Sequence, residues 1–252
     1  MTTPIALITG GSRGLGRSAA LALARRGTDV VLTYRSNAGE AAAAVKEIES
    51  LGRKAAALPL DLADPTAIPP FVDALRAALK QHFGREHIRY LLNNAGMGVH
   101  ATFEQTTPAQ FDELLNVHFK GPFFLTQALL PVIEEGGRIL NVSSGLARFS
   151  MPGYGAYAAM KGAIEVLTRY QAKELGARGI SVNAIAPGAI ETDFGGGRVR
   201  DNAELNQYVA SITAMGRTGK PEDIGPVMAA LLSEETRWIT GQRVEASGGM
   251  FL

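Results

Sequence analysis

Short apolar runs alternate along the chain with longer segments in which apolar residues recur every three or four positions. Runs such as Ile5–Thr9 and Val30–Tyr34 are typical of buried strands, and the longer segments are typical of amphipathic helices. The predicted strands are 5–9, 30–34, 55–60, 90–94, 138–142, 180–185 and 242–246. The predicted helices are 14–26, 38–51, 68–83, 108–135 with a bend at Gly121-Pro122, one through Tyr157 to about 177, and 221–232.

This alternation predicts an α/β fold, in which a doubly wound parallel sheet is covered by helices on both faces. We expect three layers of Rossmann-like type and a single domain over residues 1–252, because no linker, repeat or low-complexity block interrupts the pattern. Residues 191–216 are the exception. Their Gly195-Gly196-Gly197 run is not typical of a core, so we interpret this segment as a possible substrate flap.

Composition narrows the function classes. The chain has no cysteine, which excludes disulfides and thiol catalysis. Its net charge is only +1, so the sequence does not indicate a basic surface for nucleic acid. Its four histidines are scattered, so no metal site is predicted. No signal-like or membrane-length apolar stretch is present. We therefore expect a soluble cytoplasmic protein without a nucleic-acid or membrane partner.

Two polar residues stand four apart in an Ala-rich helical run, Tyr157 and Lys161. They share one helix face, and Ser143 and Ser144 follow the predicted strand just upstream. A phenol beside an amine is a proton donor with an activator, since the positive charge is expected to lower the phenol pKa. A serine hydroxyl can polarise a carbonyl. The Tyr-x-x-x-Lys spacing is a weak signal by itself, and a packed Tyr with a surface Lys has the same pattern.

The first predicted strand ends in glycines that lead into a helix, with the pattern Gly10-x-x-x-Gly14-x-Gly16. Glycines permit a tight turn and close approach to a diphosphate, and the helix start offers free N–H groups. The second strand ends at Thr33-Tyr34-Arg35 without the acid that binds an NAD ribose. Asp29 lies at the wrong end of that strand. Arg35 and Arg13 favour NADP(H) over NAD(H), unless both are ordinary surface charges.

Further polar and small residues follow later strands. Asp61 is placed to bind an adenine amino group, and Asn93-Asn94-Ala95-Gly96 ends the fourth strand. Carboxyl ends of parallel strands meet at one sheet edge, where ligands bind in open α/β folds.

Together these residues resemble the short-chain dehydrogenase/reductase family, and most closely its 3-oxoacyl-carrier-protein reductases and related carbonyl or glucose dehydrogenases. The match spans nearly the whole chain, and further motifs are Asn116, Pro187-Gly188, Ile190-Glu191-Thr192-Asp193 and Ile239-Thr240-Gly241-Gln242. The resemblance implies hydride transfer between a nicotinamide and a carbonyl or secondary alcohol.

By this resemblance, the catalytic residues are Ser144, Tyr157, Lys161 and Asn116. Tyr157 is the acid or base, Lys161 binds the nicotinamide ribose and lowers the Tyr157 pKa, Ser144 holds the substrate oxygen, and Asn116 orders a water. The implied cofactor-binding residues are Gly10, Ser12, Arg13, Gly14, Leu15, Gly16, Arg35, Ser36, Asp61, Leu62, Asn94, Ala95, Gly96, Tyr157, Lys161, Pro187, Gly188, Ile190 and Thr192.

Two other functions stay open. Tyr154, which is separated from Lys161 by six intervening residues, has the spacing of divergent enoyl reductases, which reduce C=C bonds. A nucleotide-binding sensor without catalysis is the other alternative. The chain departs from the family at Ser247, where an Asp is frequent, and in a longer approach to the fourth strand, Gly84–Tyr90.

Two final expectations concern substrate and assembly. Met97, Leu146, Phe149 and Tyr154 predict a largely apolar pocket for a small carbonyl or alcohol substrate, such as a hydrophobic ketone or a 3-oxoacyl thioester. The apolar helices around 111–133 and 157–177 carry Phe119, Phe123, Phe124, Leu125 and Leu167. They indicate packing between subunits, and the family resemblance implies a homotetramer.

Overall fold

One seven-stranded sheet lies at the centre of the molecule, in a computed structural model that describes residues 2–252. Its strand order is β3-β2-β1-β4-β5-β6-β7, and every neighbouring pair is parallel. The strands are β1 (Ile5–Ile8), β2 (Asp29–Tyr34), β3 (Ala55–Pro59), β4 (Ile88–Asn93), β5 (Ile133–Val142), β6 (Ser181–Pro187) and β7 (Arg243–Ala246). The predicted doubly wound α/β fold is confirmed.

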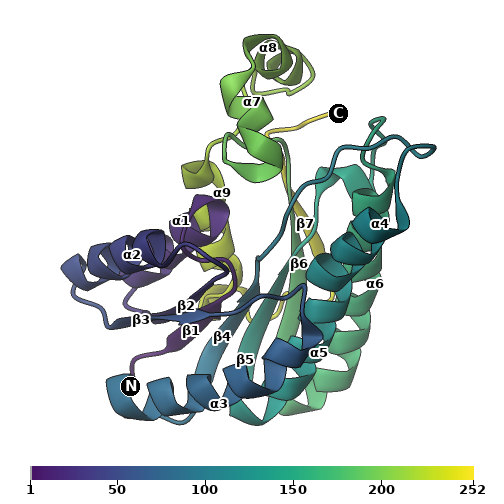
Figure 1. The fold of residues 1–252 in the computed structure, drawn as a ribbon. Helices are drawn as coiled ribbons and strands as arrows, with labels where there is room; N and C mark the ends of the chain where they lie inside the picture. Colours follow the sequence, from purple (N-terminus) through teal and green to yellow (C-terminus); the bar gives the residue numbers. More distant parts are fainter. Residues whose placement is uncertain (1) are drawn as a thin grey trace.

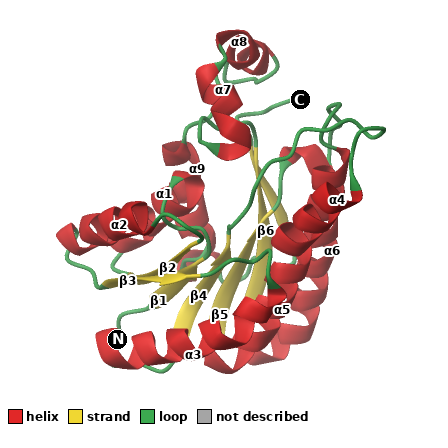
Figure 2. Cartoon of the chain, viewed as in Figure 1, coloured by secondary structure: helices red, strands yellow, loops and turns green. Residues whose placement is uncertain are grey.

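Helices cover both faces of the sheet, as Figure 1 shows. α1, α2 and α9 lie on one face, and α3, α5 and α6 lie on the other (Figures 1 and 2). The helices are α1 (Gly14–Arg25), α2 (Ala38–Ser50), α3 (Ile68–Ala78), α4 (Pro108–Leu115), α5 (Gly121–Leu129), α6 (Gly155–Leu175), α7 (Arg198–Asp201), α8 (Ala203–Ser211) and α9 (Pro221–Leu231).

The core is divided by the sheet into two apolar layers. Strand residues alternate between them, so that Ala6 and Ile8 of β1 face the α1 and α9 side, whereas Ile5 and Leu7 face the α3 and α5 side. Because both faces are covered, the central strands are largely apolar, whereas β7 at the sheet edge carries the charged residues Arg243 and Glu245.

The prediction of a helix over 108–135 was wrong at its end. The helical segment finishes with a short 3-10 turn at Leu130–Val132, and β5 already begins at Ile133. Ile133 pairs with Ile88 of β4, and the register then shifts before Tyr90 pairs with Arg138. The early part of β5 contains Glu134-Glu135-Gly136-Gly137, whose polar and glycine residues do not indicate a strand; its pairing with β4 decides the structure.

The irregularity predicted at Gly121-Pro122 lies one turn earlier. Residues Asn116–Lys120 form a π-helical turn between α4 and α5, in which the Gly121 N–H donates to the Asn116 carbonyl. Pro122 has no N–H to donate to the carbonyl of residue 118, so the regular α-helical ladder cannot continue there. Such turns are frequent at functional sites.

The order of the strands reverses between β1 and β4, because the chain runs outward from β1 to β3 and then returns to β4. The carboxyl ends of β1 and β4 therefore diverge into loops on opposite sides, and ligands bind at this edge in such folds. In Figure 1 the segment with α7 and α8 projects beyond this same edge, next to the C-terminus.

Candidate active site

The loop between β1 and α1 has the geometry of a diphosphate cradle. Gly10 and Gly14 have positive φ angles of 63° and 53°, and a Cβ on Gly16 would collide with the Gly10 carbonyl oxygen. Side chains at these positions would strain the backbone or fill the loop. The first turn of α1 carries no side-chain cap, so its N–H groups are free to bind an anion.

Asn94 holds this loop against the end of β4. Its Nδ2 donates to the carbonyls of Thr9 at 2.9 Å and Gly10 at 3.1 Å. The Thr9 hydroxyl in turn accepts from the backbone N–H groups of Asn94 and Ala95 at 2.9 and 3.0 Å. Asn94 and Ala95 are thus brought to the glycine loop, which is the strand-end cross-link expected of an asparagine there.

Arg35 and Arg13, the two candidate ligands for a 2′-phosphate, have different surroundings in the structure. Arg35 is exposed directly after β2, followed by exposed Ser36. Arg13 Nη1 lies 3.6 Å from Asp193 Oδ2, and Asp193 also bonds Arg200 at 2.6 Å. Arg35 is thus accessible to an anion at this edge, while Arg13 is already partnered by a carboxylate of the 191–216 segment.

Asp29 is a structural residue at the opposite end of β2. Its side chain is buried, and its Oδ1 accepts a hydrogen bond of 2.9 Å from the Lys54 backbone N–H. This location agrees with the interpretation that Asp29 has no part in ribose recognition.

The other cofactor-site candidates also lie at the carboxyl edge. Asp61 follows β3 and accepts from the Ala63 N–H at 2.9 Å, while neighbouring Leu62 is buried. Gly188 follows β6, and a Cβ there would come within 2.9 Å of Ser247. Ile190 forms an isolated parallel bridge with Gly219. A Cβ on Gly14 would lie 3.6 Å from the methyl carbon of Thr192, so the start of the 191–216 segment lies next to the glycine loop.

Tyr157 and Lys161 are both buried on the inner face of α6, with exposed fractions of 7% and 4%. Lys161 Nζ lies 5.5 Å from the centroid of the Tyr157 ring and donates to the Val142 carbonyl at 2.7 Å. Burial lowers the pKa of Lys161 to about 7, because the charged amine is taken out of water. An ordinary lysine is almost never buried in this way.

The expectation that Lys161 lowers the pKa of Tyr157 does not hold for this arrangement. Burial raises the pKa of Tyr157 above its ordinary value, and the nearby Ser144 side chain offsets only part of that shift. The amine is bonded to Val142 rather than to the phenol, and its own charge is weakened by burial. Tyr157 is therefore a neutral, protonated phenol, which is the form that donates a proton.

Ser144 lies at the end of the β5 segment, where its hydroxyl accepts from the Leu146 N–H at 3.2 Å. Asn116 opens the π-helical turn described above and is partly buried. The structure thus brings Ser144 into contact with Tyr157, and it places Lys161 beside them on the same helix.

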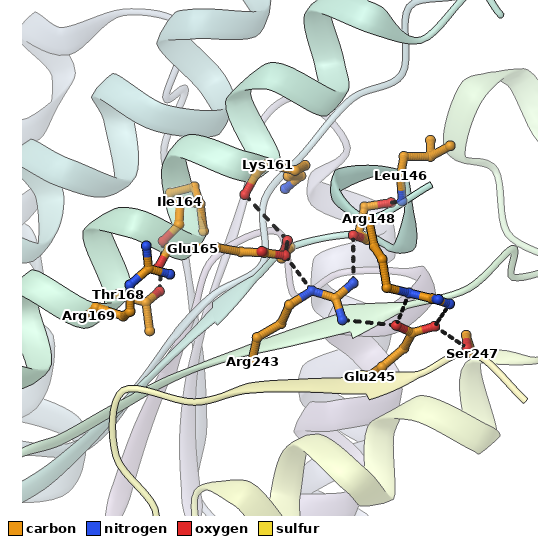
Figure 3. Close-up of polar contacts among 12 residues, drawn as sticks. Leu146, Arg148, Lys161, Ile164, Glu165, Thr168, Arg169, Arg243, Glu245 and Ser247 are labelled. Carbon is orange, nitrogen blue, oxygen red and sulfur yellow. Dashed lines mark hydrogen bonds and ion pairs between the residues drawn. The ribbon is translucent and has the colours of Figure 1, made fainter. Parts of the chain in front are cut away.

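The sequence interpretation missed an ion-pair network of Glu165, Arg243, Glu245 and Arg148, which Figure 3 shows. The Ser143 hydroxyl donates to Glu165 of α6 at 2.6 Å, and Arg243 of β7 donates to the same carboxylate at 2.6 Å. Arg243 also reaches the Ser144 carbonyl at 3.4 Å. These residues are far apart in the chain, and no local spacing signals their contact.

The same network accounts for Ser247. Its hydroxyl donates to Glu245 at 2.7 Å and accepts from the Met250 N–H at 3.2 Å. Arg148, in the loop after Ser144, forms two hydrogen bonds of 2.9 Å with the Glu245 carboxylate. Glu245 therefore connects the last strand to the loop after Ser144, and Ser247 holds the Glu245 carboxylate in place (Figure 3).

The approach to Tyr157 is lined by apolar and aromatic side chains. Phe194 lies 5.6 Å from the Tyr157 ring centroid, and Tyr154 packs edge-on against His100 at 5.1 Å. Val99, Leu114 and Tyr154 line a shallow hollow beside Tyr157 that is too narrow to hold a water molecule. Met97 and Leu146 pack against the apolar cluster of Leu114, Tyr157 and Met160.

We expect the cofactor-free protein to become more stable between about pH 7 and pH 10 because of Lys161. Below pH 7 the Lys161 amine is protonated in both the folded and the unfolded chain. Between pH 7 and the ordinary lysine pKa of 10.5, only the unfolded chain keeps this proton. The free energy of unfolding should rise by up to about 1.4 kcal/mol per pH unit in this window. Urea unfolding of the wild type and Lys161→Met measures the difference, and a difference independent of pH would contradict the burial effect.

None of the helices in residues 2–252 is both long and apolar enough to cross a membrane.

A family model described as "Enoyl-(Acyl carrier protein) reductase" matches residues 10–251. The tetrahydroxynaphthalene reductase PfmaG of Pestalotiopsis fici is 36% identical, with 97% of this chain and 90% of that protein covered.

Two solved structures are similar over nearly their full length. The promiscuous reductase LugOII, which catalyses keto-reduction at C1 during lugdunomycin biosynthesis, has a TM-score of 0.94 and 38% identity, covering 100% of this chain and 99% of that one. The angucycline C-6 ketoreductase LanV with bound NADP has a TM-score of 0.94 and 36% identity, covering 99% and 96%. The chain belongs to the short-chain dehydrogenase/reductase family and is an NADP(H)-dependent oxidoreductase that acts on a carbonyl or secondary alcohol.

Proposed function

We propose that this protein reduces the carbonyl group of a flat, largely apolar ketone, with Tyr157 as the proton donor. The observation that carries the proposal is the buried pair of Tyr157 and Lys161 on α6, in contact with Ser144. The pair lies at the sheet edge that also holds the glycine loop. A ketone oxygen between the Ser144 and Tyr157 hydroxyls would receive a hydrogen bond from one and a proton from the other.

The residues of the carboxyl edge fit a dinucleotide. The glycine loop and the uncapped start of α1 would hold the diphosphate, and Asp61 and Leu62 would face the adenine. When bound, the cofactor supplies a hydride to the carbonyl carbon. Burial lowers the Lys161 pKa to about 7, so the amine exchanges a proton readily near pH 7 and can pass one toward Tyr157 after the phenol has donated its own. Asn116 is proposed to order water at the entrance to this path.

The preference for NADP(H) over NAD(H) is also a proposal. Arg35 is exposed after β2 and suited to a 2′-phosphate, and that strand end has no carboxylate to bind a 2′-hydroxyl. Arg13 would join Arg35 only by exchanging its Asp193 partner for the phosphate. Arg35 is therefore expected to be the main determinant of preference.

The substrate class follows from the lining of the approach. Phe194, Tyr154 and Met97 present flat or deformable apolar surfaces around Tyr157, which suit stacking on a rigid ring system. Two similar proteins, PfmaG and LanV, are named for a polyhydroxynaphthalene and an angucycline substrate. A 3-oxoacyl thioester is the weaker candidate for this chain, because its carrier would favour a basic entrance and Arg148 and Arg200 are held by carboxylates.

A panel of substrates tests the proposal. It contains bicyclic aromatic ketones, 3-oxoacyl thioesters, polyols and sugars, with NADPH or NADP turnover as the readout. We expect the highest kcat/KM with the bicyclic ketones. Higher turnover with a thioester or a sugar would reject the proposed substrate class, and binding of NADPH without turnover of any compound would favour the nucleotide-sensor alternative.

The C=C reductase alternative rests on Tyr154, which lines the same hollow as Tyr157. Its ring, however, packs on His100, and Tyr154 precedes the first residue of α6. An enoyl substrate in the panel distinguishes the two functions, together with the tyrosine variants discussed below.

Residues 191–216 are proposed to act as a substrate flap. Three consecutive glycines, Gly195–Gly197, have positive φ angles, and Asp193 and Thr192 reach back to the glycine loop. We expect saturating NADPH to slow amide hydrogen exchange in this segment, because the cofactor would bind where the segment touches the loop. Exchange in β4 serves as the internal reference. Equal protection of the segment with and without cofactor would contradict this role.

A homotetramer is proposed from the exposed aromatic side chains of the outer helices. Phe123 and Phe124 of α5 and Tyr170 of α6 are 36%, 43% and 64% exposed, whereas Leu125, from the same apolar run, is fully buried within the subunit. Large exposed apolar surfaces are typical of subunit interfaces. Analytical ultracentrifugation measures the mass, and a monomeric mass at micromolar concentration would reject the proposal. The cytoplasmic location stays a prediction.

A further inference from the structure

His118 is a buried histidine beside the proposed proton donor, and none of the roles given above uses it. It lies in the π-helical turn Asn116–Lys120, two residues after Asn116, and is 1% exposed. Its ring meets the Tyr157 ring edge to face, with centroids 5.0 Å apart and planes at 89°. An imidazole so deeply buried needs hydrogen-bond partners to offset the loss of water.

The contacts of the ring define its tautomer. Nε2 lies 2.7 Å from the Met97 carbonyl oxygen and 3.3 Å from the Met97 backbone nitrogen. The two contacts call for opposite tautomers, since the Met97 N–H would donate to a bare Nε2, and we assign the proton to Nε2 because its contact with the carbonyl oxygen is the shorter one. His118 is thus a neutral imidazole whose Nε2–H donates to Met97. Burial and the nearby Lys161 hold its pKa well below 6.5, which keeps it neutral.

This hydrogen bond connects two parts of the site. Met97 belongs to the loop after β4, directly beyond Gly96, and its side chain packs against the cluster that contains Tyr157. The imidazole fits closely against that loop, since a Cβ on Gly96 would lie 2.9 Å from His118 Cε1. The ring therefore bridges the Asn94–Met97 loop, on the cofactor side, and the Tyr157 ring, on the substrate side.

The second nitrogen has no partner of its own. Within residues 2–252, Nδ1 is buried and makes no hydrogen bond. An unpaired buried acceptor of this kind costs about 1 to 3 kcal/mol, which an apolar residue at position 118 would avoid. The presence of an imidazole there therefore points to a role other than stability.

We propose that His118 is a positioning residue for Tyr157. Its neutral ring fixes the phenol by edge-to-face packing, and the Nε2–H bond to Met97 locks that ring to the loop beside the nicotinamide side of the site. This inference rests on the role proposed for Tyr157. A displacement of a catalytic group by about 1 Å can lower a rate by about 100-fold, so a positioning contact of this kind affects kcat more than binding.

Three variants separate the contributions of the ring and its nitrogens. His118→Phe keeps an aromatic ring against Tyr157 but has no donor for Met97. His118→Gln places an amide N–H near the position of Nε2, and His118→Asn places its amide near Nδ1, out of reach of Met97. His82→Phe is the matched control, because His82 is an exposed histidine remote from the site.

We expect His118→Phe to lower kcat for a ketone about tenfold, with NADPH affinity and Tm close to those of the wild type. His118→Gln should recover most of the lost kcat, His118→Asn should not, and His82→Phe should change nothing. Wild-type kcat in His118→Phe, or equal losses in the Phe and Gln variants, would overturn the proposal. So would a loss of kcat matched by a loss of NADPH affinity and Tm.

A measurement without turnover keeps the inference separate from the proposed function. NMR of ¹⁵N-histidine-labelled protein reports the His118 tautomer, and ¹³C-labelled tyrosine reports the Tyr157 ring. We expect the Nε2–H tautomer, and a Tyr157 shift in His118→Phe that returns toward the wild type in His118→Gln. An Nδ1–H tautomer, or an unchanged Tyr157 resonance, would reject the positioning role. Failure of the wild type to reduce any ketone would instead reject the proposed function.

Discussion

Replacing Tyr157 with Phe is expected to lower kcat for ketone reduction by about 100- to 10,000-fold, the contribution usual for a positioned general acid. The substitution removes one oxygen from a ring that is 7% exposed, so the surrounding packing is retained. Burial raises the pKa of the Tyr157 phenol, which keeps the proton available for donation at neutral pH. NADPH affinity should be nearly unchanged, because the proposed cofactor contacts lie mainly in the glycine loop and at the strand ends. Steady-state kinetics and NADPH fluorescence titration measure the two effects.

Tyr154→Phe is the matched control for this experiment. Tyr154 is partly exposed, lies one residue before α6 and packs against His100 rather than Lys161. We expect a change in KM for the ketone and a kcat close to that of the wild type. The opposite pattern, with Tyr154→Phe inactive and Tyr157→Phe active on an enoyl substrate, would establish the C=C reductase alternative instead.

Replacing Arg35 with Asp is expected to reverse the cofactor preference. The change removes a cation from the end of β2 and supplies a carboxylate that repels a 2′-phosphate and accepts from a 2′-hydroxyl. Hydrogen bonds to charged groups contribute about 1.5 to 3 kcal/mol, so kcat/KM with NADPH should fall about 10- to 100-fold. The value with NADH should rise. The ratio of the two kcat/KM values is the measurement.

Arg25→Asp provides the same change of charge at a remote place. Arg25 is exposed in the last turn of α1, away from the carboxyl edge of the sheet. Its substitution should leave the ratio unaltered. If Arg35→Asp leaves the ratio of the two kcat/KM values unchanged, Arg35 does not determine the preference for NADPH over NADH. Arg13→Asp would then be the next variant, because Arg13 is the other candidate ligand for a 2′-phosphate.

Local sequence determined those features that depend on backbone conformation and burial. The glycine spacing from Gly10 to Gly16 predicted a turn that only small residues can form, and the structure has positive φ angles at Gly10 and Gly14. The apolar runs predicted strands buried on both faces, since a parallel sheet has no solvated side. The position of Asp29 at the start of its run was sufficient to separate it from the ribose site.

The errors arose where a distant partner outweighs local preference. Glu134 and Gly136 do not favour a strand, yet pairing with β4 extends β5 back to Ile133. The pKa of Tyr157 was expected to fall because an amine is near, but the sequence contains no information on burial, which raises it. The carbonyl of Val142, and not the phenol, accepts from Lys161.

The sequence by itself determined the sheet, the glycine loop and the presence of Ser144, Tyr157 and Lys161 at the right spacing, because each depends on residues close together in the chain. Only the tertiary structure decided which residues surround them. Arg243 meets Glu165 across 78 positions, and His118 meets Tyr157 across the gap between two helical segments. Contacts of this kind are set by the packing of helices on a shared sheet, and burial at those contacts is what shifts the pKa values of Tyr157 and Lys161.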